Sequence, residues 1–113
     1  MLDNIVNSLR KSGFIISQHK ASYATLGGEI LEEDRLTATS TSGLVRITIS
    51  RKSDEQWYRV SILMLGAKAT ESTASALSRL GGSVDYEPGD RLLAVFKKAG
   101  LGDVEEIVNE VLG

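Results

Sequence analysis

The sequence predicts an α+β fold in which an antiparallel β-meander is flanked by helices. Three alternating apolar segments separated by short turns predict the meander, and amphipathic segments on either side of it predict the helices. The expected order is a helix, three to five strands, a helix, a two-stranded hairpin and a helix. Because 113 residues suit one domain and no linker or repeat divides them, residues 1–113 are expected to form a single domain.

The N-terminal part predicts a short helix followed by extended chain. Asp3 is a candidate N-cap, and Gly13 is placed to end the helix. The apolar stripe between them is Ile5, Val6 and Leu9. Phe14 begins an extended segment, and whether Tyr23 to Leu26 forms a strand stays open. The acidic run after it is expected to be a solvated turn between strands; its residues are Glu29, Glu32, Glu33 and Asp34.

The clearest pattern covers three strands, 35–41, 44–51 and 56–65. Ser42-Gly43 is a two-residue hairpin loop, and a polar turn separates the second strand from the third. Pairing Thr41 with Leu44 and Arg51 with Gln56 puts the apolar residues of all three strands on one face. That face comprises Leu36, Ala38, Val45, Ile47, Ile49, Tyr58, Val60, Ile62 and Met64. A slip of one residue mixes the two faces, so the pattern specifies the register.

The C-terminal part predicts a helix, a second hairpin and a last helix. Thr70 caps the first of these helices, and Gly81-Gly82 ends it. Residues 87–90 read Glu-Pro-Gly-Asp and suit a type II turn within the hairpin. Asp103 and Glu106 form a capping-box-like pair at the start of the last amphipathic helix. We expect the helices to cover the apolar face of the sheet.

Composition removes several classes of function. The chain has no cysteine and one histidine, His19, so we expect no metal site, no cofactor and no enzymatic activity. No apolar run is long enough to span a bilayer, and the N-terminus does not resemble a signal peptide, which predicts a cytoplasmic protein without membrane contact. Asparagine, glutamine and methionine are sparse, which favours a heat-adapted source.

Basic residues concentrate in the predicted meander, although the whole chain carries a net charge of -2. The predicted register places Arg35, Ser50 and Trp57 in one row of the polar face, Thr37, Thr48 and Arg59 in the next, and Thr39, Arg46 and Ser61 in a third. No carboxylate lies in these rows. Arginine pairs with phosphate, and tryptophan stacks on bases. The face therefore predicts non-sequence-specific binding of single-stranded nucleic acid, DNA or RNA. The candidate residues are Arg35, Arg46, Thr48, Arg51, Lys52, Trp57 and Arg59.

Two other interpretations of this face remain open. The face is an ordinary solvated surface, or it is an interface, since arginine and tryptophan are also favoured where proteins meet. Small acidic α+β domains look like bacterial secretion chaperones, so the alternative function is a chaperone-like or adaptor domain that binds polypeptide as an oligomer. The stripe of the last helix, with Leu101 and Leu112, is a candidate contact with a second subunit.

The layout, together with Arg46, Arg51, Trp57 and Arg59, resembles the N-terminal domain of the archaeal ThermoDBP group of single-stranded DNA-binding proteins and their related proteins. The resemblance covers most of the chain. It implies non-sequence-specific binding of single strands in a cleft of apolar and basic residues, and function as a homo-oligomer. The acidic net charge is a departure from what such binding requires.

Overall fold

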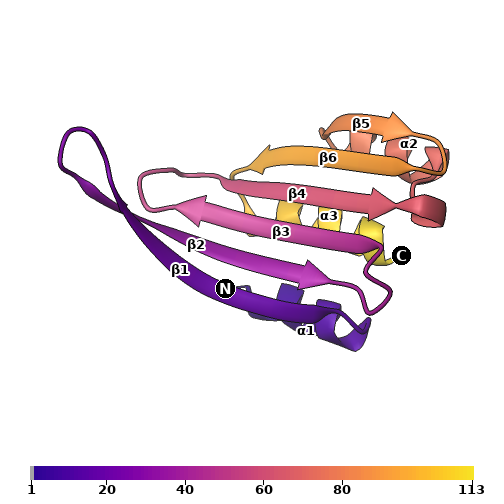
Figure 1. Ribbon diagram of the computed structural model, residues 1–113, viewed down its shortest axis with the longest axis horizontal. Coiled ribbons are helices and arrows are strands. Elements are labelled where there is room, and N and C mark those ends of the chain that lie inside the picture. Colours follow the sequence, from indigo (N-terminus) through magenta and orange to yellow (C-terminus); the bar gives the residue numbers. More distant parts are fainter. Residues whose placement is uncertain (1) are drawn as a thin grey trace.

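The computed structural model describes residues 2–113 and has an α+β fold, with three helices on one side of a six-stranded antiparallel sheet (Figure 1). The strand order across the sheet is β1-β2-β3-β4-β6-β5. In chain order the elements are α1 (Asp3–Lys11), β1 (Ile15–Ala24), β2 (Ile30–Thr39), β3 (Val45–Lys52), β4 (Tyr58–Leu65), the 3-10 turn η1 (Gly66–Lys68), α2 (Glu71–Arg79), β5 (Ser83–Glu87), β6 (Arg91–Lys98) and α3 (Leu101–Leu112).

The predicted register between β2 and β3 is confirmed. Leu36 pairs with Ile49, and Ala38 pairs with Ile47. The connecting loop is longer than the expected two residues, because the pairing ends where the Ser40 N–H donates to the Val45 carbonyl at 2.9 Å. Gly43 lies in this loop with φ +75°, a conformation that glycine adopts without steric cost.

The predicted register between β3 and β4 is wrong by two residues. Ile49 pairs with Val60 rather than Tyr58, because β3 continues through Lys52 and the chain then uses residues 53–57 to reverse direction. A hydrogen bond from the Glu55 N–H to the Lys52 carbonyl closes this turn at 3.1 Å. Since a shift of two residues leaves every side chain on its face, the predicted apolar face is nevertheless correct.

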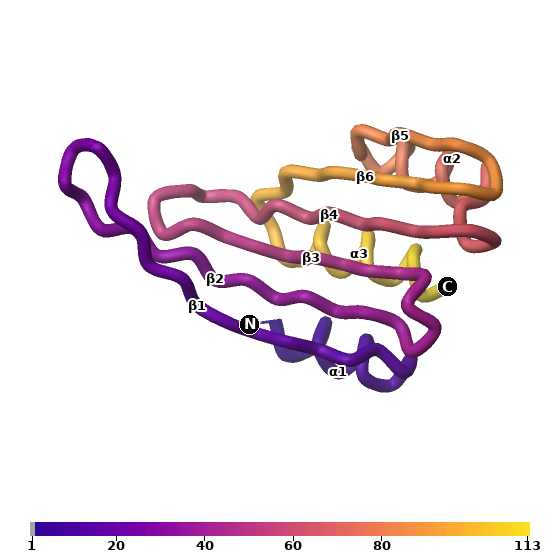
Figure 2. Tube along the Cα trace, in the orientation of Figure 1, coloured from indigo at the N-terminus to yellow at the C-terminus, as the bar shows by residue number. Residues whose placement is uncertain are grey.

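The first hairpin answers one open question and corrects one expectation. β1 is one continuous strand in which Tyr23 and Ala24 are the last residues, so Tyr23 to Leu26 is not a strand of its own. Most of the acidic run lies inside β2 and not in a turn. The neighbouring strand β1 places a cation beside two of these acids. Lys20 Nζ lies 3.7 Å from carboxylate oxygens of both Glu32 and Asp34. The tip of this hairpin projects beyond the rest of the sheet as an arm (Figure 2).

The second hairpin, β5–β6, joins the same sheet through β6, which pairs with β4. Its turn at 87–90 forms as expected, with Gly89 at φ +69° and the Asp90 N–H donating to the Glu87 carbonyl at 3.0 Å. The cap of α2 is also confirmed, since the Thr73 N–H donates to Thr70 Oγ1 at 3.3 Å.

The two other helix starts differ from the prediction. Asp3 is the first residue of α1 and not its N-cap, which is Leu2. α3 begins at Leu101 after Gly100, with no side-chain cap, so the expected start at Asp103 is wrong. The helix begins earlier because the chain turns at Gly100 directly after β6 ends. Leu101 and Leu112 pack partly buried against the chain's own core.

The core lies between the helices and one face of the sheet. It consists of the predicted apolar face, extended by Leu92, Ala94 and Phe96 of β6, and of the inward stripes of the three helices. The helices lie behind the sheet in Figure 1, so no layer formed by residues 2–113 covers the opposite face of the sheet. Among residues 2–113, no helix is long and apolar enough to cross a membrane.

Candidate nucleic-acid interface

The face of the sheet opposite the helices, here called the open face, carries a row of basic residues. Direct cross-strand pairing places His19 beside Arg35, Arg35 beside Ser50, Ser50 beside Arg59, and Arg59 beside Lys97. We call these five residues the cation row, in which Ser50 is the one member that is not a basic residue. Three strand spacings separate Arg35 from Lys97, which corresponds to about 14 Å.

Hydroxyl groups dominate the next row of the open face. Its residues are Ser17, Thr37, Thr48, Ser61, Val95 and Ser83. The row beyond it is mixed and partly apolar, and contains Ile15, Thr39, Arg46, Leu63, Leu93 and Asp85. The open face therefore grades from basic through hydroxyl-bearing to partly apolar along the strand direction.

The register correction rearranges the predicted rows. Arg59 lies beside Ser50 and not beside Thr48, whose neighbour on β4 is Ser61. Trp57 lies in the loop before β4 and pairs with no strand residue. Its side chain still belongs to this region, because Lys97 Nζ lies 5.2 Å from the centroid of its ring. With 37% of its surface exposed, Trp57 remains accessible to a ligand.

Two glutamates contradict the expectation that this face is free of acid. Glu33 Oε1 accepts hydrogen bonds from Nε and Nη2 of Arg35, the closer at 2.6 Å. Glu55 also accepts two hydrogen bonds, with Arg59 Nη2 donating to Oε1 at 3.0 Å and Nε donating to Oε2 at 3.3 Å. Both glutamate side chains are only 14% exposed, whereas the arginines are 47% and 43% exposed. Each glutamate thus binds its arginine from the less accessible side of the guanidinium.

The second of these pairs shifts the pKa of both partners. The hydrogen bond from Arg59 is the largest cause that lowers the pKa of Glu55, and the charges of Arg59, Lys52 and Lys97 lower it further. The hydrogen bond to Glu55 in turn raises the pKa of Arg59. Glu55 is therefore ionised throughout the neutral range, in a local field that is positive.

Arg51 and Lys52, adjacent in sequence, lie on opposite faces. The guanidinium of Arg51 is on the helix side, 5.4 Å from the centroid of the Tyr58 ring, and donates to the Glu55 carbonyl at 3.4 Å. Arg51 therefore leaves the candidate site. Lys52 remains in it, with Nζ 5.6 Å from the centroid of the Tyr23 ring. Arg46 also remains, and it has no ion pair with any residue in the described range.

The structure adds four residues to the site that were not predicted from the sequence: Tyr23, Glu33, Glu55 and Lys97. Tyr23 is partly buried, and its hydroxyl is shielded from solvent and has no hydrogen-bond partner within residues 2–113. Lys97 enters because β6 is the neighbour of β4, a pairing that connects strands distant in the chain. The alternation of Glu33 with Arg35 along β2 was the one signal in the sequence that these two side chains share a face.

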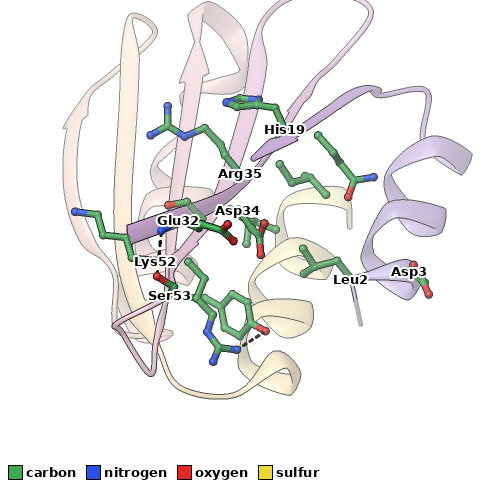
Figure 3. A pocket seen from close by; sticks show the side chains of 14 residues that line it. Leu2, Asp3, His19, Glu32, Asp34, Arg35, Lys52 and Ser53 are labelled. Atoms are coloured by element: carbon green, nitrogen blue, oxygen red, sulfur yellow. Dashed lines mark hydrogen bonds between the residues drawn. The ribbon is translucent and has the colours of Figure 1, made fainter. Parts of the chain in front are cut away.

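A groove of about 580 Å³ lies at the other side of the same strands, next to the start of α1 (Figure 3). Leu36, Ile49 and Tyr58 contribute its apolar part, and Leu2 and Asp3 close it at the helix. Glu32 and Asp34 line it as well (Figure 3). Nowhere in the described range do three or more histidine or carboxylate side chains cluster as metal ligands do.

Charge is distributed unequally between the two sides of the molecule. The open face has six basic residues, Arg35, Arg46, Lys52, Arg59, Arg91 and Lys97, against four acidic ones, Glu33, Glu55, Asp85 and Glu87. This excess of two positive charges contrasts with the chain's net charge of -2.

Comparison with known proteins finds no matching family model, no matching curated protein and no matching solved structure.

Proposed function

We propose that this chain binds single-stranded nucleic acid, DNA or RNA, without sequence preference, on the open face of its sheet. The observation that carries the proposal is the cation row, which crosses neighbouring strands of a sheet face that no helix of the described chain covers. Binding and not catalysis is the expected activity.

The chemistry of the rows suits a phosphate backbone and stacked bases. Arginine and lysine pair with phosphate oxygens, and the adjacent threonine and serine hydroxyls donate hydrogen bonds to them. Trp57, at the β6 end of the row, offers an aromatic surface on which a base can stack. Because none of these contacts reads the edge of a base, they favour binding without sequence preference.

The charge asymmetry supports the same proposal. A protein with net charge -2 repels a polyanion over most of its surface, so a ligand of this kind is directed to the positive side. Duplex DNA carries its phosphates on a rigid cylinder, whereas a single strand follows a flat sheet and exposes its bases to Trp57. We therefore expect preference for the single strand.

The experiment is a titration of a fluorescently labelled oligo-dT, and of a duplex of equal length, followed by anisotropy. Tighter binding of the single strand, with quenching of Trp57 emission in a parallel unlabelled titration, is the expected result. Trp57 is the sole tryptophan, so the emission reports on this site alone. Absence of binding at tens of micromolar protein and low salt would overturn the proposal, since even non-specific binders reach about 10⁻⁴ to 10⁻⁶ M.

Two variants locate the site. Trp57→Ala is expected to weaken binding by about 1 to 3 kcal/mol through loss of stacking. Lys97→Ala removes a cation that lies beside Arg59 and is expected to reduce the magnitude of the salt slope by about 0.7. Arg79→Ala is the matched control, since it removes an exposed cation from α2, on the other side of the molecule.

One observation favours the polypeptide-binding alternative. The partly apolar row includes Leu63 and Leu93, and Val95 beside it is 46% exposed, so part of the open face offers apolar surface. A polypeptide bound there depends on apolar contact, and salt weakens it little. An unfolded, uncharged polypeptide that displaces labelled oligo-dT, or binds where oligo-dT does not, would favour this second function.

A further inference from the structure

β1 forms one edge of the sheet, and among the strands that the structure describes it pairs only with β2. The hydrogen bond from the Thr25 N–H to the Glu29 carbonyl shows that odd-numbered residues of β1 direct their backbone groups toward β2. Even-numbered residues therefore direct theirs to the free edge. The residues that do so are Ile16, Gln18, Lys20, Ser22 and Ala24.

This edge lacks the features that usually prevent strands from pairing. It extends over ten residues without proline, and Lys20 is its one lysine, arginine or carboxylate side chain. Ile15 at its start is 70% exposed on the open face. Lys20 Nζ lies 3.7 Å from a carboxylate oxygen of both Glu32 and Asp34 of its own chain.

We propose that two copies of this chain pair along β1, antiparallel, with His19 on the two-fold axis, to form one continuous sheet. A two-fold axis perpendicular to the sheet keeps the open faces on one side, so odd-numbered residues must face odd-numbered ones. Among the registers that meet this condition, those centred on His19 and on Lys20 pair the largest number of β1 residues. Centring on Lys20 places two like charges directly opposite each other, which is destabilising.

The register centred on His19 is self-complementary. It sets Ile15 against Tyr23 of the partner subunit and Gln18 against Lys20 of the partner subunit. About eight backbone hydrogen bonds form, because each hydrogen-bonded pair of an antiparallel ladder contributes two. Ile15, exposed in the single chain, thereby gains an aromatic neighbour.

The helices leave room for this arrangement. α1 lies beside the first half of β1, and its first residues share a groove with Gln18 and His19, near the middle of the strand (Figures 1 and 2). In an antiparallel pair the first halves of the two β1 strands lie on opposite sides of the two-fold axis. The two α1 helices therefore do not meet.

Pairing through His19 joins the two cation rows end to end. The combined row runs from Lys97 of one copy to Lys97 of the partner subunit across nine strand spacings, or about 43 Å along the sheet. This consequence rests on the proposed function, whereas the dimer itself rests only on the edge. The test of the dimer accordingly contains no nucleic acid.

The experiment is a cysteine scan, which is clean because the chain has no cysteine. In the proposed register the two His19 positions form a non-hydrogen-bonded pair with Cα atoms about 4.5 Å apart, within the range of a disulfide. His19→Cys is expected to form a covalent dimer under mild oxidation on non-reducing electrophoresis. Ala21→Cys and Ser17→Cys are matched controls on the same face, since each lies about 13 Å from its counterpart along the strands.

Sedimentation of the unmodified chain is the second measurement, and a dimer is the expected species. A covalent dimer formed by Ala21→Cys or Ser17→Cys in preference to His19→Cys would overturn the register. Equal cross-linking at all three positions would show that the chains meet by random collision. This result would overturn the proposed interface. An unmodified chain that sediments as a monomer at its highest soluble concentration overturns it as well.

Discussion

Glu33 and Glu55 determine how accessible the arginines of the cation row are to a ligand. Each glutamate is mostly covered and binds its arginine through two hydrogen bonds, so the guanidinium is oriented but also partly neutralised. Because the folded-state pKa of Glu55 is lowered, the pair's contribution to stability is present above the ordinary pKa of glutamate. It is lost as the pH falls through the lowered value.

Glu55→Gln is expected to tighten binding of oligo-dT. The substitution keeps a hydrogen-bond acceptor for Arg59 but removes the negative charge that competes with phosphate. Removal of one such charge is expected to strengthen binding roughly two- to fivefold at low salt, as measured by anisotropy. Glu71→Gln, at an exposed position of α2, is the control and should change affinity little. Weaker binding in Glu55→Gln would show that the carboxylate acts mainly by positioning Arg59.

Gly82 is required by the packing of α2 against the sheet. A Cβ at this position would lie 2.6 Å from Cζ of Phe96 and 3.0 Å from the Leu77 carbonyl oxygen. Phe96 is 1% exposed, so its ring cannot turn outward into solvent without leaving the core. Gly82→Ala is therefore expected to lower the free energy of unfolding by about 1 to 3 kcal/mol, as measured by urea denaturation.

Gly102→Ala serves as the comparison for that measurement. Nothing lies within 4 Å of a Cβ at Gly102, which is inside α3. Alanine in a helix is favoured over glycine by about 0.5 to 1 kcal/mol, so this variant should be more stable than the native chain. Similar destabilisation of both variants would contradict the packing explanation for Gly82.

At the level of elements, the strand pattern predicted which side chains lie on each face but not which residues are opposite each other. The β3–β4 register was wrong because the length of the loop at residues 53–57 depends on how far β3 continues, which alternation does not determine. The predicted composition of each face was still correct, because alternation repeats every two residues and the register was wrong by two. This explains why the apolar face was confirmed while the neighbours of Thr48 and Arg59 were not.

The elements that sequence reasoning missed depend on contacts between distant parts of the chain. The acids of β2 suit a strand only because Lys20 lies opposite them, and Lys97 joins the site only because β6 pairs with β4. Local patterns contain neither contact. Arg51 and Lys52 were both candidates because they belong to the basic residues of the predicted meander, whereas the strand separates them onto two faces.

The cap of α2 offers a test at this scale. Thr70 Oγ1 accepts the Thr73 N–H, so Thr70→Ala leaves one N–H of the first turn without its partner. The expected loss in free energy of unfolding is about 1 kcal/mol by chemical denaturation. Ser75→Ala, at an exposed position within the same helix, is expected to be neutral or slightly stabilising. Equal losses in the two variants would argue against the cap.

For the whole molecule, the helices occupy one side and the excess of basic residues lies on the other. Binding of oligo-dT through about three cations of the row predicts a slope of log K against log salt near -2, since single strands contribute about -0.7 per phosphate contact. Anisotropy titrations at several salt concentrations measure this slope. A slope near zero would indicate that apolar contacts dominate and would favour the polypeptide-binding alternative.

The unequal edges of the sheet also bear on aggregation. β5, at the far edge, has only five residues, includes Asp85 and Glu87, and is followed directly by Pro88. Short length, charge and proline all discourage a further strand from adding there. Only β1 then offers a long free edge, and pairing it with its own copy uses that edge completely. In the proposed dimer growth therefore stops at two chains, because both outer edges of the joined sheet are β5 strands.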